Sequence, residues 1–514
     1  MLENYLKNII NSKVYGAARQ TPLDPMPQLS DRFNNKILLK REDLQPVFSF
    51  KIRGAYNKIS SLSAQEKARG IIAASAGNHA QGVALSAQLL KLKATIVMPV
   101  TTPDTKVNAV SRYGAKVILY GDTFDQTLEH CLGLQKAENL VFIAPYDDPD
   151  IIAGQGTIGL EILQQISQKQ KSESAIDAIF VPVGGGGLIA GIAAVIKYLQ
   201  PSIQIIGVEP EDAASATAAL AQQRRIVLDH VGLFADGVAV KQVGAEPFKI
   251  IAKYVDRMIT VNTDEICAAI KDIFDDTRVI AEPAGALSVA GIKKYLQQNA
   301  KTGQTLVGIN SGANTNFNRL RHITERAEIG EGKEALLAVR IPEKPGSFKR
   351  FCQILDGHAV TEFNYRYHDA HQAEIFVGIE LADKEDLQLI IALLNRQEEP
   401  MQVLNMTDNE MAKLHLRHMI GGYISENQNM PKERVFRFEF PERPGALMQF
   451  LNHLGNQWNI SLFHYRNHGA AYGRVLVGLQ VPVQEQQQFD QFLQKLDYTC
   501  VEETANPAYQ RFLI

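Results

Sequence analysis

One lysine of this chain stands in a setting that suits covalent chemistry. Lys51 follows the aromatic residue Phe50 in the segment SFKIRGAYN and begins a stretch with helical character. Burying a lysine ammonium is costly, so an apolar neighbour lowers its pKa and frees a nucleophilic amine. Such an amine can form an imine with a carbonyl compound. Taken alone, the residue also fits a surface position at a helix start, where most lysines lie.

A second lysine is a rival for the same role. Lys40 lies in the segment KILLKRED, whose apolar run predicts a buried strand. That context favours an ion pair or another structural role, so we assign the reactive amine to Lys51.

A run of four glycines follows a strongly apolar segment. Gly184, Gly185, Gly186 and Gly187 end at Leu188 and precede a helical pattern. Such a loop lets backbone N–H groups approach a phosphate, and the helix adds its N-terminus. No lysine follows the glycines, which argues against a nucleotide-binding P-loop. The alternative is a flexible turn without a ligand.

Another turn combines small and polar residues after an apolar run. It consists of Ser75, Ala76, Gly77, Asn78 and His79. Its backbone N–H groups are suited to receive a substrate carboxylate. Serine and asparagine are also favoured at helix N-caps, and the two roles are compatible.

A late serine completes the set. Ser311 lies in the segment NSGAN, directly after an apolar run. One lysine, two glycine-bearing turns and this serine are what pyridoxal phosphate (PLP) requires: a Schiff-base amine, a phosphate site and a partner for the ring nitrogen. Serine cannot hold that nitrogen protonated as aspartate would. The electron sink is then weak, which favours β-elimination over transamination.

The four segments, in this order and spacing, resemble the fold-type II PLP enzymes, and among them the biosynthetic threonine dehydratases. The resemblance implies that Asn78 lies beside the phenolic oxygen of PLP. It also implies deamination of L-threonine, and secondarily of L-serine, to a 2-oxo acid and ammonia. Inhibition by isoleucine, an opposing effect of valine, and a homotetramer are further implications.

Two positions differ from related enzymes. Serine racemases resemble the chain around Ala76 but carry a serine there, and alanine has no proton to exchange. These relatives also hold a divalent cation with an acidic cluster. The chain keeps Glu209 but has Ser215 where a second carboxylate is expected. Since a hard cation needs several oxygen ligands, we predict no metal site.

The elements that must position these residues are strands and helices in alternation. The runs GIIAASAG, AIFVPVG and TLVGINSG are separated by helical segments such as 151–168. This pattern predicts an α/β fold with doubly wound parallel sheets, and each motif follows a strand. We expect a catalytic domain over 1–320, with a small subdomain over roughly 52–150, and a connector over 321–334.

The remainder of the chain contains a repeat. The segment LLAVRIPEKPGSFKRF is echoed by VFRFEFPERPGALMQF, and TEFNYR by SLFHYR. The repeat predicts two α+β modules over 335–407 and 434–506 that resemble ACT-like regulatory modules. By that resemblance Tyr365, Tyr465 and Arg466 line effector sites. The alternative is that the modules serve only in oligomerisation.

Bulk properties exclude several classes of protein. The formal net charge of −3 gives no footprint for nucleic acid, and no apolar stretch is long enough to cross a bilayer. The four cysteines form no CxxC pair, so neither a disulfide framework nor a zinc site is expected. We expect a cytoplasmic protein, since reduced thiols are usual there.

Two other functions stay open from the sequence. One is another PLP reaction, such as serine dehydration or β-replacement with sulfide. The sulfide-using synthases resemble Thr-Ser-Gly-Asn-Thr where this chain reads Ser-Ala-Gly-Asn-His. The other is an amino-acid sensor without catalysis, against which the intact Lys51 speaks.

Overall fold

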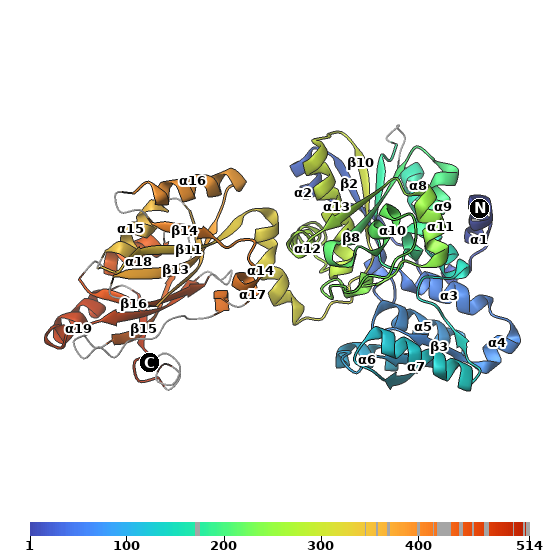
Figure 1. Ribbon diagram of the computed structural model, residues 1–514, viewed down its shortest axis with the longest axis horizontal. Coiled ribbons are helices and arrows are strands. Elements are labelled where there is room, and N and C mark those ends of the chain that lie inside the picture. Colours follow the sequence, from blue (N-terminus) through green and yellow to red (C-terminus); the bar gives the residue numbers. More distant parts are fainter. Residues whose placement is uncertain are drawn as a thin grey trace. The chain divides into compact units, whose positions relative to one another are not determined.

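The structure is a computed structural model with two compact units, Met1–Gly330 and Glu331–Ile514 (Figure 1). It describes residues 1–169, 175–344, 346–355, 358–366, 371–397, 401–414, 416–418, 433–441, 446–454, 457–466, 472–496, 498–506 and 509.

The larger sheet of the first unit has six strands in the order β1-β2-β10-β7-β8-β9. All neighbours are parallel except β1 and β2. The strands are β1 Leu23–Pro25, β2 Lys36–Arg41, β7 Ala178–Pro182, β8 Gln204–Pro210, β9 Arg257–Val261 and β10 Thr305–Asn310. Every residue of β7 and β10 is buried, as expected for parallel strands covered on both faces.

Helices cover both faces of this sheet. Alternate residues of one strand enter different cores: Leu39 packs with the core formed by α2, α12 and α13, and Leu38 with that of α8, α9 and α11. The helices are α1 Leu2–Ile10, α2 Pro27–Phe33, α8 Pro149–Lys169, α9 Gly187–Leu199, α10 Ser215–Ala221, α11 Ala245–Tyr254, α12 Thr263–Thr277, α13 Pro283–Asn299 and α14 Arg319–Glu331. Short 3₁₀ turns are η1 Val14–Gly16, η2 Glu42–Leu44, η3 Glu211–Ala213 and η4 Asp236–Val238. Among the described helices, none is long and apolar enough to span a membrane.

A smaller parallel sheet has the strand order β5-β4-β3-β6. Figure 1 shows α5, α6 and α7 beside β3 in this part of the first unit. Its strands are β3 Ile71–Ala74, β4 Ala94–Met98, β5 Lys116–Leu119 and β6 Val141–Phe142, and its helices are α3 Lys51–Ser61, α4 Ala64–Arg69, α5 Asn78–Leu89, α6 Asp104–Ser111 and α7 Phe124–Ala137. The predicted class, two doubly wound α/β subdomains, is confirmed.

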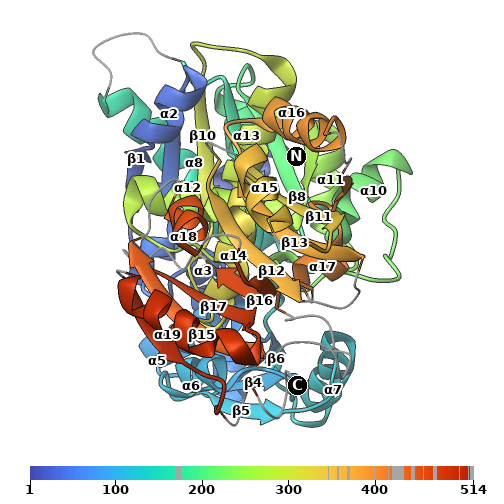
Figure 2. The same cartoon turned by 90° about the vertical axis from the view of Figure 1, so that its left-hand side faces the viewer.

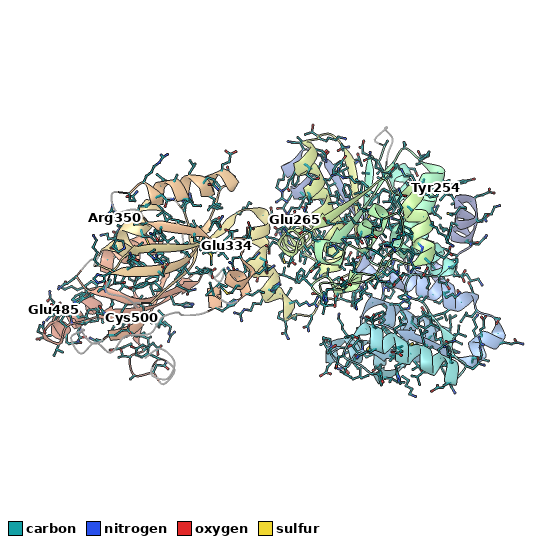
Figure 3. All side chains as sticks on the ribbon, viewed as in Figure 1. Tyr254, Glu265, Glu334, Arg350, Glu485 and Cys500 are labelled. Atoms are coloured by element: carbon teal, nitrogen blue, oxygen red, sulfur yellow. The ribbon has the colours of Figure 1, made fainter. Side chains whose placement is uncertain are left out.

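Capping boxes show why several helices begin where they do. In α12 the side chain of Asn262 accepts the N–H of Glu265, and the Glu265 carboxylate accepts the N–H of Asn262. Glu265 is labelled in Figure 3. Both donors would otherwise lack partners at the helix start. The same arrangement begins α4, with Ser63 and Glu66, and α7, with Thr123 and Gln126.

The structure differs from the expected connector after residue 320. Residues Arg319–Glu331 form helix α14, and Ile323 and Ala327 on it pack into the core of the first unit. The segment is rich in charge, but Arg326 is buried and forms an ion pair with Asp264, 3.1 Å away. Because the segment is so rich in charged residues, its sequence indicates a connector, although it forms an amphipathic helix that belongs to the first unit.

The second unit contains a single sheet of eight strands in the order β14-β11-β13-β12-β16-β17-β15-β18. The two repeats join where β12 and β16 pair antiparallel (Figure 2). In this pairing Tyr365 lies opposite Phe463, and Phe363 lies opposite Tyr465. The strands are β11 Glu334–Pro342, β12 Val360–Arg366, β13 Gln372–Glu380, β14 Gln402–Asn405, β15 Glu433–Pro441, β16 Asn459–Arg466, β17 Tyr472–Gln480 and β18 Thr499–Glu502.

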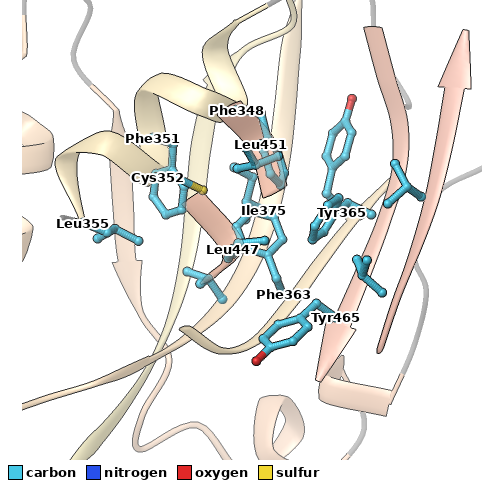
Figure 4. Close-up of a cluster of buried hydrophobic side chains, with 14 of the residues drawn as sticks. Phe348, Phe351, Cys352, Leu355, Phe363, Tyr365, Ile375, Leu447, Leu451 and Tyr465 are labelled. Atoms are coloured by element: carbon cyan, nitrogen blue, oxygen red, sulfur yellow. The ribbon is translucent and has the colours of Figure 1, made fainter. Parts of the chain in front are cut away.

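Helices of the second unit share one aromatic core with the sheet (Figure 4). Phe348 packs against Phe363 and Phe463, so the core is continuous across both repeats. The helices and turns are α15 Ser347–Ile354, α16 Lys384–Asn395, α17 Glu410–Leu414, η5 Leu416–His418, α18 Ala446–Leu454, η6 Val483–Glu485 and α19 Gln486–Lys495. The prolines of the repeated Pro-Gly turns, Pro345 and Pro444, lie outside the described residues.

Candidate active site

A cavity lies in the first unit where loops leave the carboxyl ends of strands in both sheets. This is the expected place for a ligand in doubly wound sheets. All four predicted segments meet there: Lys51 with Phe50, Asn78 from the turn before α5, the glycine run with Leu188, and Ser311. The other lining residues are Pro145, Tyr146, Gln155, Pro182, Gly237, Val238, Glu282 and Ala284.

Lys51 begins α3 and points its amine into this cavity. Its Nζ lies 2.9 Å from the carbonyl oxygen of Pro145 and 5.3 Å from the centre of the Phe50 ring. Burial lowers the pKa of the amine to about 8, although the nearby Glu282 carboxylate acts in the opposite direction. A substantial fraction of the amine is therefore neutral near physiological pH, as a nucleophile requires.

The backbone ties Lys51 to Ser311. Ser49 forms an antiparallel bridge with Gly312, and the N–H of Phe50 donates to the carbonyl oxygen of Ser311 at 3.2 Å. Residues far apart in sequence are thus held in a fixed register beside the cavity. The Ser311 hydroxyl donates at 3.3 Å to the carbonyl oxygen of Ala284, a long bond that leaves the hydroxyl able to turn toward a ligand.

The glycine run forms a cradle that side chains would fill. A Cβ on Gly185 would lie 2.2 Å from the Tyr146 ring, and one on Gly184 would lie 2.8 Å from Val238. Gly186 has a φ of +88°, which disfavours other residues. Within the described chain, no backbone oxygen accepts the N–H groups of Gly184 to Gly186. These donors, and the start of α9 at Gly187, fit an anionic group.

The turn before α5 contributes less to the cavity than expected. Of its residues, only Asn78 lines it; Ser75, Ala76 and Gly77 are partly exposed beside it. The Ser75 hydroxyl accepts the N–H of Gly77 at 3.2 Å. His79 is buried, and its Nε2 lies 2.9 Å from the carbonyl oxygen of Ile143.

Burial and the charge of Lys51 lower the pKa of His79 to about 3. Its imidazole is therefore neutral, and with Nε2 beside a carbonyl oxygen it serves to hold the turn.

The lining residues that the sequence does not predict include three with polar side chains, Tyr146, Gln155 and Glu282. Tyr146 packs its ring on the glycine run, Gln155 leaves its buried Oε1 without a partner in the described structure, and Glu282 faces Asn78. Burial raises the pKa of Glu282 to about 7. The available signal was Glu282 itself, a lone carboxylate between Ala281 and a Pro-initiated helix in an apolar stretch.

The rival lysine lies outside this cavity. Lys40 is fully buried and its Nζ lies 2.6 Å from Glu161, which also pairs with Arg53 at 2.6 Å. Arg53 in turn lies 2.7 Å from Glu42. Removing one member of such a buried pair typically costs about 3–5 kcal/mol, so this cluster has a structural role.

Glu209 is occupied by local hydrogen bonds. Its carboxylate accepts the N–H groups of Ala216 and Thr217 at 2.8 and 2.9 Å. Burial raises the pKa of this carboxyl group. Ser215 is buried nearby, and its hydroxyl has no partner in the described structure. Across the described residues, no group of three or more His, Cys, Asp or Glu side chains is placed to hold a metal.

Comparison with known proteins agrees with this geometry. Residues 14–312 match the family described as pyridoxal-phosphate dependent enzyme, and residues 325–416 and 426–513 match the C-terminal regulatory domain of threonine dehydratase. The biosynthetic L-threonine dehydratase of Pasteurella multocida is 54% identical over 512 residues, which cover 99% of this chain and 97% of the relative. The chain belongs to the biosynthetic threonine dehydratase family.

Other dehydratases and a solved structure extend the comparison. The Escherichia coli biosynthetic L-threonine dehydratase is 51% identical over 510 residues, covering 99% of this chain and 97% of the relative. The processed form of threonine deaminase isoform 2 from Solanum lycopersicum is 48% identical with a TM-score of 0.61, covering 63% of this chain and 93% of that one.

The cavity of this dehydratase family member fits its PLP cofactor. The cradle that a Cβ on Gly185 would obstruct offers N–H donors for the phosphate. Lys51 offers an amine for the imine bond, and Ser311 offers a hydroxyl for the ring nitrogen. These donors therefore match PLP both at its phosphate and at its ring.

A second cavity lies in the regulatory unit. Its lining includes Glu343, Phe348 and Tyr365 from the first repeat and Leu451 and Trp458 from the second. Figure 4 shows Phe348, Leu451 and Tyr365 among the clustered side chains. The cavity combines an apolar wall with a carboxylate, a combination suited to an aliphatic amino acid.

Hydrogen bonds hold the polar part of this cavity. The Tyr365 hydroxyl donates to Glu343 at 2.5 Å, and Asn459 donates to the other Glu343 oxygen at 3.0 Å. Tyr465 is buried in the shared core and does not line the cavity. Arg466 lies in β16, but its side chain is outside the described residues.

Proposed function

We propose that this protein converts L-threonine to 2-oxobutanoate and ammonia by eliminating water, as the first step of isoleucine biosynthesis. L-Serine is a secondary substrate in this proposal. The observation that carries it is the Lys51 amine, which lies with the glycine cradle and Ser311 around one cavity. The names of the full-length relatives support the choice of threonine.

Lys51 is the general base of the proposed reaction. When bound, PLP supplies an electron sink for the carbanion that forms at the substrate α-carbon. The neutral Lys51 amine takes the α-proton, and its pKa near 8 suits a proton acceptor near neutral pH. The Pro145 carbonyl, 2.9 Å from Nζ, keeps the amine beside the cavity.

The turn before α5 holds the substrate in this proposal. The N–H groups of Ala76, Asn78 and His79 receive the carboxylate, because they have no acceptor in the described structure and two of them open α5. The N–H groups of Ser75 and Gly77 shape the turn instead, since they donate to the Val97 carbonyl oxygen and the Ser75 hydroxyl. Asn78, which lines the cavity, would lie beside the phenolic oxygen of the bound cofactor, as the family resemblance implies. Ala76 carries no exchangeable proton, which favours elimination over racemisation.

Ser311 sets the preference for elimination. Its hydroxyl would meet the ring nitrogen of bound PLP without carrying a charge, so the carbanion would be only weakly stabilised. The β-hydroxyl takes up a proton and leaves as water, which balances the α-proton that Lys51 removes, before side reactions of the carbanion occur. The released 2-aminobut-2-enoate takes up water and yields 2-oxobutanoate and ammonia.

Isoleucine is the proposed inhibitor, bound at the cavity of the regulatory unit. Phe348, Leu451 and Trp458 offer apolar contacts for the side chain, and Glu343 offers a carboxylate for the ammonium group. Valine acts against isoleucine, and the enzyme is a homotetramer; both rest on the family resemblance. A cytoplasmic location is supported by four free cysteines.

The test is an assay of 2-oxo acid formation with threonine or serine, with and without isoleucine, beside a visible absorption spectrum. We expect a cofactor band, greater turnover of threonine than of serine, and inhibition by isoleucine. A purified protein without the band, or with the band but without 2-oxo acid formation from either substrate, would contradict the proposal.

A further inference from the structure

Three polar side chains form a directed chain of hydrogen bonds beside the Lys51 cavity. The Nδ2 of Asn314 donates to the carbonyl oxygen of Val47 at 2.8 Å and to the Oδ1 of Asn78 at 2.7 Å. The Nδ2 of Asn78 then donates to a Glu282 oxygen at 2.6 Å. The chain links the smaller subdomain, which carries Asn78, to loops of the larger one.

The direction of this chain follows from chemistry. A backbone carbonyl only accepts hydrogen bonds, so the Asn314 atom beside Val47 must be the amide nitrogen. The same nitrogen also contacts Asn78, so the facing Asn78 atom must be the oxygen. The other end of the Asn78 amide is then its NH₂ group, which faces the ionised Glu282 as an acceptor. Each orientation is fixed by its neighbours.

One N–H of Asn78 remains after these contacts. The NH₂ group has two hydrogens, and within the described chain only Glu282 accepts from it. Asn78 lines the cavity together with Lys51 and Ser311. The second N–H is therefore available to a ligand in that cavity.

We propose that Asn314 and Glu282 are positioning residues that fix the amide direction of Asn78, so that its remaining N–H is presented to the phenolic oxygen of bound PLP. This inference rests on the proposed function, because it concerns the same cofactor. Without Asn314, the Asn78 oxygen loses its donor and the amide can turn over, which would present an oxygen to an anionic oxygen.

Glu282 is held on both of its oxygens. One accepts from Asn78, and the other accepts the backbone N–H of Asn314 at 3.1 Å. Burial and the charge of Asp236 raise its pKa to about 7, while Asn78, Lys106 and Asn314 act in the opposite direction. This carboxylate also favours the ammonium form of Lys51, whose pKa it raises against the effect of burial. Both acceptor positions are present only while Glu282 is ionised.

A double-mutant cycle on the holoenzyme tests the positioning role. The parent, Asn314→Ala, Asn78→Ala and the double variant are compared by the position of the visible cofactor band and the rate of cofactor release on dilution. We expect each single variant to shift the band and to speed release about tenfold, the typical effect of losing one hydrogen bond to a charged group. The double variant should have the same band position and release rate as Asn78→Ala, because Asn314 acts only through Asn78.

A second variant, Glu282→Gln, keeps the test valid if Asn314→Ala fails to fold. Glu282→Gln keeps the size of the side chain but replaces one of two acceptors with a donor, so one of its two bonds is lost. The effects of Glu282→Gln and Asn78→Ala on band position and release rate are likewise expected not to add, so their double variant should behave as Asn78→Ala does. Asn318→Ala removes an exposed asparagine of the same loop and is the matched control, with an unchanged band and release rate.

Additive effects of Asn314→Ala and Asn78→Ala would overturn the positioning role, since a purely structural residue acts independently of Asn78. An unshifted band in both Asn314→Ala and Glu282→Gln would overturn it equally. Failure of the proposed function is distinguishable, because the parent protein would then lack either the cofactor band or 2-oxo acid formation.

Discussion

The amine of Lys51 and the carbonyl oxygen of Pro145 lie 2.9 Å apart, although 94 residues separate them in the chain. Pro145 follows the last strand of the smaller sheet, and Lys51 begins the helix that packs against α5 and α8. The contact fixes the direction of the amine without a counter-charge. A carbonyl accepts a hydrogen bond from either the ammonium or the neutral amine, so the pKa is set by burial, which lowers it, and by the Glu282 carboxylate, which opposes that shift.

We therefore expect the Lys51 amine of the cofactor-free protein to titrate near pH 8. Below that pH the ammonium predominates and imine formation with an added aldehyde slows; above it the rate levels off. Glu282→Gln removes a negative charge that favours the ammonium, so its midpoint should lie at lower pH. The rate of imine formation against pH measures both midpoints, and a parent midpoint above about pH 10, the range of an unperturbed lysine, would contradict the assignment.

Lys51→Ala should abolish the visible band and reduce turnover at least about a thousandfold, because one residue supplies both the imine bond and the general base. The fold should persist, since the lysine side chain makes a single hydrogen bond in the described structure. Circular dichroism and thermal unfolding check the fold. Turnover above a trace in a folded Lys51→Ala protein would remove this residue from the chemistry.

Gly185→Ala should weaken cofactor binding by at least about tenfold, because the added Cβ would lie 2.2 Å from the Tyr146 ring and displace it into the cradle. Gly133→Ala is the matched control, since nothing lies within 4 Å of its Cβ and it is on helix α7. The control should bind normally and gain about 0.5–1 kcal/mol of stability. Equal cofactor affinity of both variants would argue against the phosphate cradle.

Ser311→Asp should slow elimination and allow transamination, because an aspartate keeps the ring nitrogen protonated and stabilises the carbanion. The buried position of Ser311 keeps the new carboxylate away from water and next to that nitrogen. The ratio of 2-oxobutanoate formed to cofactor converted to its amine form is the measurement. An unchanged rate and ratio would place Ser311 away from the ring nitrogen.

Tyr365→Phe should raise the isoleucine concentration for half-inhibition about tenfold with little change in uninhibited turnover, because Glu343 loses the hydroxyl that orients it. Tyr465→Phe is the comparison, since that residue is buried outside the cavity lining and should have a smaller effect. Inhibition curves for Tyr365→Phe that superimpose on the parent would move the effector site elsewhere.

Strand positions were predictable wherever the strand is buried. The runs that predicted β3, β7 and β10 are mostly apolar, and all three strands are found as expected. The edge strands β9 and β14 were not predicted, because their exposed residues interrupt the apolar pattern. Short, half-exposed edge strands depend on pairing with a neighbour rather than on a pattern of their own.

The site was predictable where local sequence carries the chemistry. Lys51, the glycine run and Ser311 each stand in a distinctive segment, and the structure brings them to one cavity. Tyr146 is not predictable, since only residues distant in sequence make it part of the site. For Glu282 the sequence offers one signal, a lone carboxylate in an apolar stretch, and its partner Asn78 is distant in sequence. The regulatory cavity likewise depends on Asn459 reaching Glu343 across two repeats.

Pairing of β12 with β16 joins the two repeats into one continuous sheet. If the chain were divided between the repeats, β12 and β16 would each become an edge strand with unpaired backbone N–H and C=O groups. Such an edge pairs readily with other strands. A separated repeat would then pair with itself or with other chains. A single repeat is therefore a poor unit to move into another protein. The two repeats together can be moved as one unit, because their β12–β16 pairing is kept within it.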